Sequence, residues 1–105
     1  MAVVHLNEDE FDSFIDTDLP VVVDFWASWC GPCKMMGPVF ETLSKEFSKK
    51  MHFAKVNVDE EASLSSKFGI QGIPCLIVFQ KGKEIDRIVG FNPEDALREK
   101  LKSFL

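Results

Sequence analysis

The segment 21–27 constrains the fold most, because it is apolar at every position except Asp24. A strand that is covered on both faces reads as a nearly continuous apolar run, whereas a half-exposed strand alternates apolar and polar residues. We therefore predict a central strand whose sheet carries helices on both faces.

Strands and helices are predicted to alternate around this segment. Further strands are expected at 3–6, 51–58, 75–79 and 84–89. Helices are expected to start at Asn7, to run from about 32 to 49, to run from Asp59 to an end at Gly69, and to start again at Pro93. The order β-α-β-α-β-α-β-β-α indicates early parallel strands with right-handed crossovers, then an antiparallel hairpin through Lys81-Gly82. The predicted fold class is α/β, with a mixed, twisted sheet between helices.

Three residues are expected to cap helices. Asn7 starts the first helix, and Glu10 lies three residues later, as in a capping box. Asp59 is expected to cap the third helix. Asn92 is expected to cap the last helix, with Pro93 in its first turn.

Composition excludes several classes of protein. The chain has 105 residues, which suits a single domain over 1–105, and its 46% hydrophobic content excludes disorder. The net charge of −5 argues against a nucleic-acid partner, and the longest apolar run, 75–79, is far too short to span a membrane. Residues 1–33 hold seven acids and no Lys or Arg, and most of these acids belong to the first helix and the loop after it.

The chain has three cysteines, an odd number that does not suit a secreted disulfide framework. The first residues carry no basic segment of the kind that begins a secretory signal. We therefore expect a reducing, cytoplasmic location. A Cys-x-x-Cys pair in such a location is more often redox-active or metal-binding than structural.

Cys30 and Cys33 form such a pair between the central strand and the next helix. Ligand and active sites of open α/β sheets lie beyond the carboxyl ends of strands. Cys30 falls at the helix start, where free backbone N–H groups and the helix dipole favour a thiolate, while Cys33 lies about one turn inside. Disulfide exchange needs two such unequal sulfurs. One alternative is that the two cysteines supply two of the four ligands of a zinc ion, but the sequence has no second Cys-x-x-Cys to supply the others. The other alternative is that they are two ordinary core thiols.

Asp24 is the second unusual residue, because a carboxylate within an apolar strand is costly to bury. Lys55 alternates with apolar neighbours in the strand 51–58 and could approach Asp24 from there. Asp24 could accept the proton of Cys33, with its acidity tuned by Lys55, or the two residues could form a buried structural ion pair. A third feature is Pro74, which directly precedes an apolar strand, a position where a cis peptide bond is possible.

Together these residues resemble the thioredoxin family. The resemblance covers essentially the whole chain, and its specificity comes from the segment Trp-Ala-Ser-Trp-Cys-Gly-Pro-Cys-Lys at 26–34 in combination with other positions. Those positions are Asp24, Pro38, Lys55, Ile73-Pro74, Gly82 and Gly90.

The resemblance implies a five-stranded mixed sheet flanked by four helices and a protein-disulfide reductase activity. It implies that Cys30 attacks a target disulfide, that Cys33 resolves the mixed disulfide, and that Asp24 transfers the proton with Lys55 beside it. It also makes the Ile73–Pro74 bond cis. No cofactor or metal is implied beyond the Cys30–Cys33 disulfide.

The resemblance further implies a flat apolar rim on which an extended target segment pairs with the backbone at Ile73. The expected partners are client proteins with disulfides and a dedicated reductase, and the chain is expected to be monomeric. The rim is expected to comprise Trp29, Gly31, Pro32, Ile73, Pro74, Gly90 and Phe91.

Cys75 departs from the family pattern, which usually has Thr after this proline. It is expected to be a small buried thiol, although a third redox thiol or a metal ligand are the alternatives. Gly37 is a lesser departure that should loosen its helix slightly. Two rival functions stay open: a disulfide oxidase or isomerase, and a metal-binding or docking module on the same surface.

Overall fold

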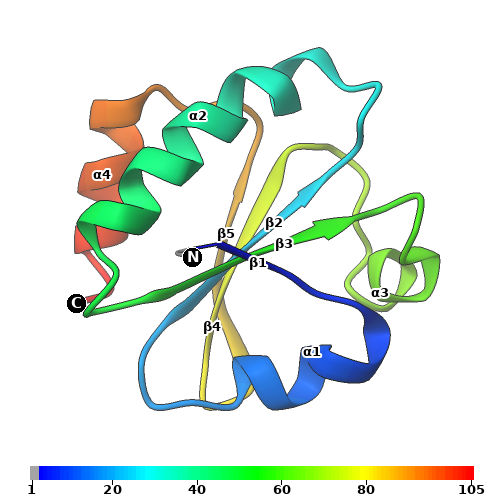
Figure 1. The fold of residues 1–105 in the computed structure, drawn as a ribbon, viewed down its shortest axis with the longest axis horizontal. Coiled ribbons are helices and arrows are strands. Elements are labelled where there is room, and N and C mark those ends of the chain that lie inside the picture. Colours follow the sequence, from blue (N-terminus) through cyan, green and yellow to red (C-terminus); the bar gives the residue numbers. More distant parts are fainter. Residues whose placement is uncertain (1–2) are drawn as a thin grey trace.

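The computed structural model describes residues 3–105, and these form one five-stranded sheet flanked by four helices (Figure 1). The strands stand in the order β1-β3-β2-β4-β5, so β2 is central. The elements follow the predicted order: β1 (Val3–His5), α1 (Glu8–Ile15), β2 (Val21–Trp26), α2 (Gly31–Glu46), β3 (His52–Asn57), α3 (Ala62–Lys67), β4 (Cys75–Gln80), β5 (Lys83–Val89) and α4 (Glu94–Lys102).

The sheet is mixed, as predicted. β3 runs parallel to both β1 and β2, whereas β4 is antiparallel to β2 and to β5. Every residue of β2 except Trp26 is buried, which confirms a central strand covered on both faces.

Two apolar clusters lie on opposite faces of the sheet, because successive strand residues point to opposite faces. Val22 of β2 packs with residues of α2 and α4, while Val21 and Val23 pack with residues of α1 and with Leu64 of α3. Figure 1 shows the same division, with α2 and α4 on one side of the strands and α1 and α3 on the other. Asp24 shares the face of Val22 and therefore lies on the side that α2 covers.

Two helix ends form as the sequence predicts. The side chain of Asn7 accepts a hydrogen bond from Glu10 N at 3.0 Å, and Glu10 Oε1 accepts one from Asn7 N at 3.2 Å, which completes the capping box. Gly69 ends α3 with a φ of +61°, a left-handed conformation that costs glycine little.

Three expectations about helix ends are wrong. α3 begins after Glu61 with no side-chain cap, and Asp59 bonds elsewhere. α4 begins after Pro93, which is itself the N-cap, because the Asn92 amide instead donates to Gly90 O at 3.3 Å. α2 ends at Glu46, three residues before the expected 49, where the N–H of Phe47 closes the last turn on Leu43 O.

The β4–β5 hairpin turns through two residues with positive φ, Lys81 (54°) and Gly82 (79°), the conformation of a type I′ turn. Beyond the turn the register shifts: Phe79 pairs with Glu84, but Val78 pairs with Asp86. Ile85 is therefore an extra residue on β5, a bulge in the edge strand.

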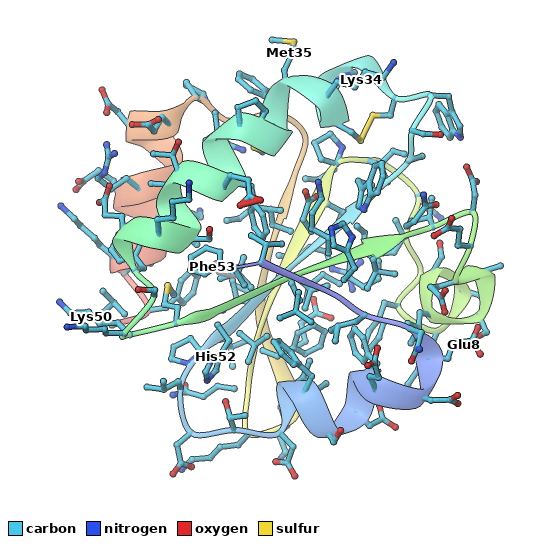
Figure 2. The ribbon with its side chains drawn as sticks, viewed as in Figure 1. Glu8, Lys34, Met35, Lys50, His52 and Phe53 are labelled. Atoms are coloured by element: carbon cyan, nitrogen blue, oxygen red, sulfur yellow. A yellow bond between two sulfur atoms is a disulfide. The ribbon has the colours of Figure 1, made fainter. Side chains whose placement is uncertain are left out.

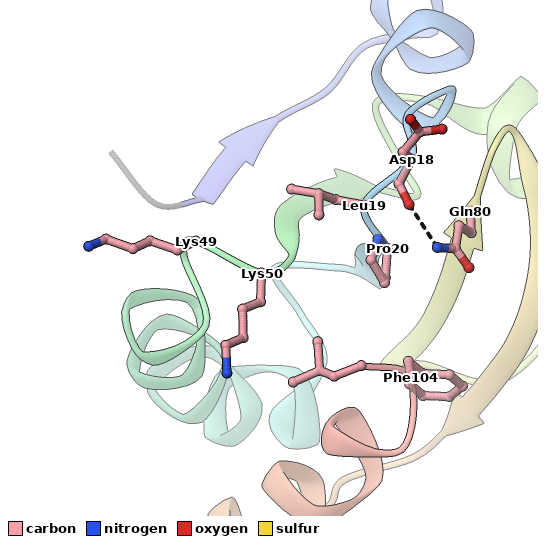
Figure 3. Close-up of a pocket in the computed structure, with 8 residues that line it drawn as sticks. Asp18, Leu19, Pro20, Lys49, Lys50, Gln80 and Phe104 are labelled. Atoms are coloured by element: carbon pink, nitrogen blue, oxygen red, sulfur yellow. Dashed lines mark hydrogen bonds between the residues drawn. The ribbon is translucent and has the colours of Figure 1, made fainter.

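A hollow of about 410 Å³ lies where the α1–β2 loop, the α2–β3 connection and the carboxyl end of the chain meet (Figure 3). Gln80 Nε2 donates to Asp18 O at 2.7 Å across one side of it. The Asp18 carboxylate and the Lys49 amine both point away from its centre in Figure 3, so these charged groups do not converge as in a ligand site. No helix within residues 3–105 is long and apolar enough to cross a membrane.

Candidate active site

Cys30 and Cys33 lie at the amino end of α2, just beyond the carboxyl end of β2, and they form a disulfide. Figure 2 shows the bond as the yellow link near Lys34. The two Cα atoms are 5.2 Å apart, within the usual range for a disulfide. Cys30 is the N-cap of α2, and its sulfur accepts a hydrogen bond from Cys33 N at 3.2 Å. One free donor of the helix start, the N–H of Cys33, is therefore directed at the Cys30 sulfur and favours negative charge there.

The disulfide sits in a small apolar cluster beyond the carboxyl end of the central strand. Ala27 is buried with the two cysteines, and Trp26, Val58 and Ile73 pack against them. The sulfur of Cys30 lies 3.8 Å from the carbonyl oxygen of Ile73. The Ile73–Pro74 peptide bond is cis, as the family resemblance implies, and Pro74 is buried.

Asp24 is fully buried, and neither of its carboxylate oxygens has a hydrogen-bond partner among residues 3–105. Burial raises the pKa of Asp24 to about 7, and the positive charge of Lys55 opposes the rise. Lys55 is directly opposite Asp24 in the β2–β3 register, so the two share a face of the sheet. The Lys55 amine lies 4.6 Å from the ring centre of Trp26, a cation–π contact. The predicted pair is thus brought together.

The predicted rim residues lie around the disulfide with graded exposure. The side chain of Trp29 is 68% exposed, and that of Phe91 is 38% exposed. Gly31 and Pro32 are exposed as well, whereas Ile73 and Gly90 are half-buried. Pro74 contributes no comparable surface, because it is buried.

Two exposed apolar side chains were missed from the sequence. Val89 is 60% exposed, and its Cγ1 would lie 3.1 Å from a Cβ on Gly72, so it flanks the loop that leads into Ile73. Met35 is 59% exposed in the first turns of α2. Its position three residues after Pro32 was the available signal, since helical residues three apart share a face.

Asp59 has a role that the sequence did not indicate. Its Oδ2 accepts a hydrogen bond from Trp29 Nε1 at 2.9 Å. The turn after β3 is thereby connected to the exposed indole beside Cys30.

Cys75 is a free, buried thiol that pairs with Phe25 in the sheet register and belongs to the cluster under α1. It therefore faces the side of the sheet opposite to Asp24. Burial raises the pKa of the Cys75 thiol. Within the described part of the chain, no three His, Cys, Asp or Glu side chains gather closely enough to hold a metal ion.

A Cys-x-x-Cys disulfide at a helix amino end, beside a cis-proline loop on a mixed five-stranded sheet, defines a thiol–disulfide oxidoreductase. The thioredoxin family model matches residues 2–103, and the chain belongs to the thioredoxin family. It is 44% identical over 105 residues to the thioredoxin of Staphylococcus epidermidis and 43% identical to that of Staphylococcus aureus, with full coverage of both sequences in each case. The solved structure of Malassezia sympodialis thioredoxin is similar at a TM-score of 0.91 and 38% identity, over 97% of this chain and 90% of that one.

Membership confirms the predicted fold class and activity: the protein is a dithiol–disulfide reductant that works through a redox-active cysteine pair. Family members need no cofactor beyond that disulfide. Membership also implies protein disulfides as substrates and a reductase as a partner.

Proposed function

We propose that this single domain, spanning 1–105, is a general reductant of cytoplasmic protein disulfides and that it donates electrons to client enzymes. The observation that carries the proposal is the hydrogen bond from Cys33 N to the Cys30 sulfur at the start of α2. The same donor would stabilise a Cys30 thiolate in the reduced protein.

In the proposed first step, the Cys30 thiolate attacks one sulfur of the target disulfide. An intermolecular disulfide forms, and the other target sulfur leaves as a thiolate. Trp29 is exposed, and the Ile73 carbonyl lies close to the Cys30 sulfur. Both features support docking of an extended target segment across the Cys30 sulfur. The docking surface we propose is the predicted rim of Trp29, Gly31, Pro32, Ile73, Pro74, Gly90 and Phe91.

In the proposed second step, Cys33 passes its proton to the Asp24 carboxylate and attacks the Cys30 sulfur. The second target sulfur leaves as a thiolate, so the target gains two electrons and the Cys30–Cys33 disulfide forms. A pKa of about 7 suits Asp24 to accept and release a proton near neutral pH. Lys55 tunes this acidity through its charge. A reductase then returns two electrons to the disulfide.

The test is reduction of insulin with dithiothreitol as the electron donor. We expect Cys30→Ser to abolish turnover and Cys33→Ser to accumulate a mixed disulfide with insulin, detectable by mass spectrometry. In a protein that keeps both cysteines, Asp24→Asn should slow the step in which Cys33 resolves the mixed disulfide with insulin. Cys75→Val is the matched control, because it removes a thiol from the opposite face of the sheet.

Normal turnover by Cys33→Ser would refute the two-cysteine mechanism. A reduction potential well above the reducing range of the cytoplasm would favour an oxidase or isomerase instead. Stoichiometric metal in protein purified without chelator would favour a metal-binding module.

A further inference from the structure

The β3–α3 loop, residues 58–61, runs beside the disulfide and is held by several hydrogen bonds. Its first N–H, that of Val58, donates to Trp26 O at 2.9 Å, and the N–H of Glu61 donates to Asn57 O at 2.9 Å. Asn57 Oδ1 accepts a hydrogen bond from Asp59 N at 2.9 Å and a longer one from Glu60 N at 3.3 Å. The side chain of Asn57 therefore fixes the backbone at Asp59.

This loop presents two side chains to the site. Val58 packs against the buried cluster that contains the cysteine pair. Asp59 Oδ2 accepts the hydrogen bond from Trp29 Nε1 at 2.9 Å. Since Trp29 is 68% exposed, packing alone restrains its ring weakly, and this hydrogen bond adds a directional restraint.

We propose that Asn57 and Asp59 are positioning residues for substrate docking: Asn57 fixes Asp59, and Asp59 holds the Trp29 indole in place beside Cys30. The inference rests on the proposed function, in which Trp29 belongs to the docking surface. An indole that is already held loses little conformational freedom when a protein segment covers it.

The restraint of the Trp29 indole should affect protein substrates more than small disulfides. A client protein segment that covers Trp29 gains from its fixed position, whereas a small disulfide such as hydroxyethyl disulfide reacts at Cys30 without covering the indole. Ordering one such side chain during binding corresponds to an affinity change of about 2- to 10-fold. Loss of the anchor should therefore raise the KM for protein substrates by about this factor.

The variants separate the hydrogen bond from the charge. Asp59→Ala removes the acceptor, and Asp59→Asn removes the charge but keeps an oxygen acceptor. Glu60→Ala is the matched control, because it removes the neighbouring exposed charge without touching Trp29. Asn57→Ala removes the acceptor that fixes Asp59, and Asn57→Asp restores one.

The first measurement is steady-state insulin reduction alongside reduction of hydroxyethyl disulfide. For Asp59→Ala we expect a 2- to 10-fold higher KM for insulin, with kcat and the rate with hydroxyethyl disulfide changed less than 2-fold. Asn57→Ala should also raise the KM for insulin. Asp59→Asn and Asn57→Asp, which keep an oxygen acceptor, should have a KM close to the wild-type value. An equal rise in KM for Glu60→Ala would overturn the proposal, because charge alone would then explain it.

The second measurement is the indole N–H resonance of Trp29 by nuclear magnetic resonance, assigned with Trp29→Phe, and it needs no substrate. In Asp59→Ala the resonance should shift upfield and exchange faster with water, while the Trp26 resonance stays in place. An unchanged Trp29 resonance would overturn the positioning proposal. Failure of the wild type to reduce insulin would refute only the proposed function, because the resonance measurement does not depend on it. Displacement of both indole resonances would also overturn it, because the variant would then disturb the whole site.

Discussion

Asp24 shows how one residue can set the pH response of both stability and chemistry. Its carboxylate is buried without a hydrogen-bond partner among the described residues, and its pKa is raised to about 7. An acid whose pKa is higher in the folded state binds its proton more tightly there than in the unfolded chain. Ionisation therefore destabilises the fold.

We expect Asp24→Asn to be more stable than the wild type, by a margin that depends on pH. Below the ordinary value of 3.8 the carboxyl is neutral in both states and imposes no such penalty. As pH rises from there to about 7, the unfolded chain ionises first, and the wild type loses about 1.4 kcal/mol of unfolding free energy per pH unit. The advantage of the variant should grow to as much as about 4 kcal/mol and stay constant above pH 7.

Urea unfolding of both proteins at pH 5 and pH 8 measures this difference. The amide of the variant carries its own burial cost, but that cost does not change with pH. Equal differences in unfolding free energy at the two pH values would show that Asp24 ionises normally in the folded protein.

For single residues, the sequence identifies a functional candidate when its chemical type is unusual for its local surroundings. It does not identify a hydrogen-bond partner that the fold brings from elsewhere. Asp24 was recognisable because a carboxylate in an apolar strand is unusual in any fold. Asp59 was misassigned as a helix cap, because its partner, the indole of Trp29, lies 30 residues away along the chain. Similarly, Asn92 stands before a helix, but its amide bonds to Gly90 instead.

Among the elements, α2 and α3 provide a comparison of two glycines with equal space and different backbones. A Cβ added at Gly37 or at Gly69 would meet nothing within 4 Å. Gly37 lies inside α2, whereas Gly69 ends α3 with a φ of +61°. The two substitutions therefore differ in backbone conformation, and Gly37 also has Pro38 directly after it, whose ring restricts the preceding residue.

We expect Gly37→Ala to stabilise the protein by up to about 1 kcal/mol, because alanine restricts the unfolded chain and favours the helix. Gly69→Ala should destabilise it by about 1 kcal/mol, because side chains disfavour the left-handed conformation. Thermal unfolding of the two variants measures both effects, and shifts of the same sign would contradict the explanation.

For the whole molecule, the sheet separates Asp24 from the third cysteine. Asp24 lies on the face covered by α2, and Cys75 lies in the cluster under α1. The sequence predicted the element order and the mixed sheet, since local periodicity and crossover rules determine them. The strand order β1-β3-β2-β4-β5 could not be read from it, because pairing depends on contacts between distant segments.

This separation predicts that Cys75→Ser lowers the stability of the protein but leaves its activity unchanged. The hydroxyl would be buried in an apolar cluster, and we expect a loss of about 1–3 kcal/mol in unfolding free energy. The kcat and KM for insulin should stay within 2-fold of the wild-type values at a temperature where both proteins are folded. A large change in kcat would place Cys75 in the reaction.

The extra residue on β5 has a consequence for the behaviour of the protein at high concentration. An edge strand offers unpaired backbone groups to any neighbouring chain, and a bulge breaks the regular spacing that such pairing needs. Deleting Ile85 should restore a continuous register between β4 and β5 and leave a straighter edge. We expect that variant to form oligomers at concentrations where the parent chain stays monomeric by light scattering. One inserted residue would then help to prevent pairing between the sheet edges of two molecules while the surface around the disulfide stays open.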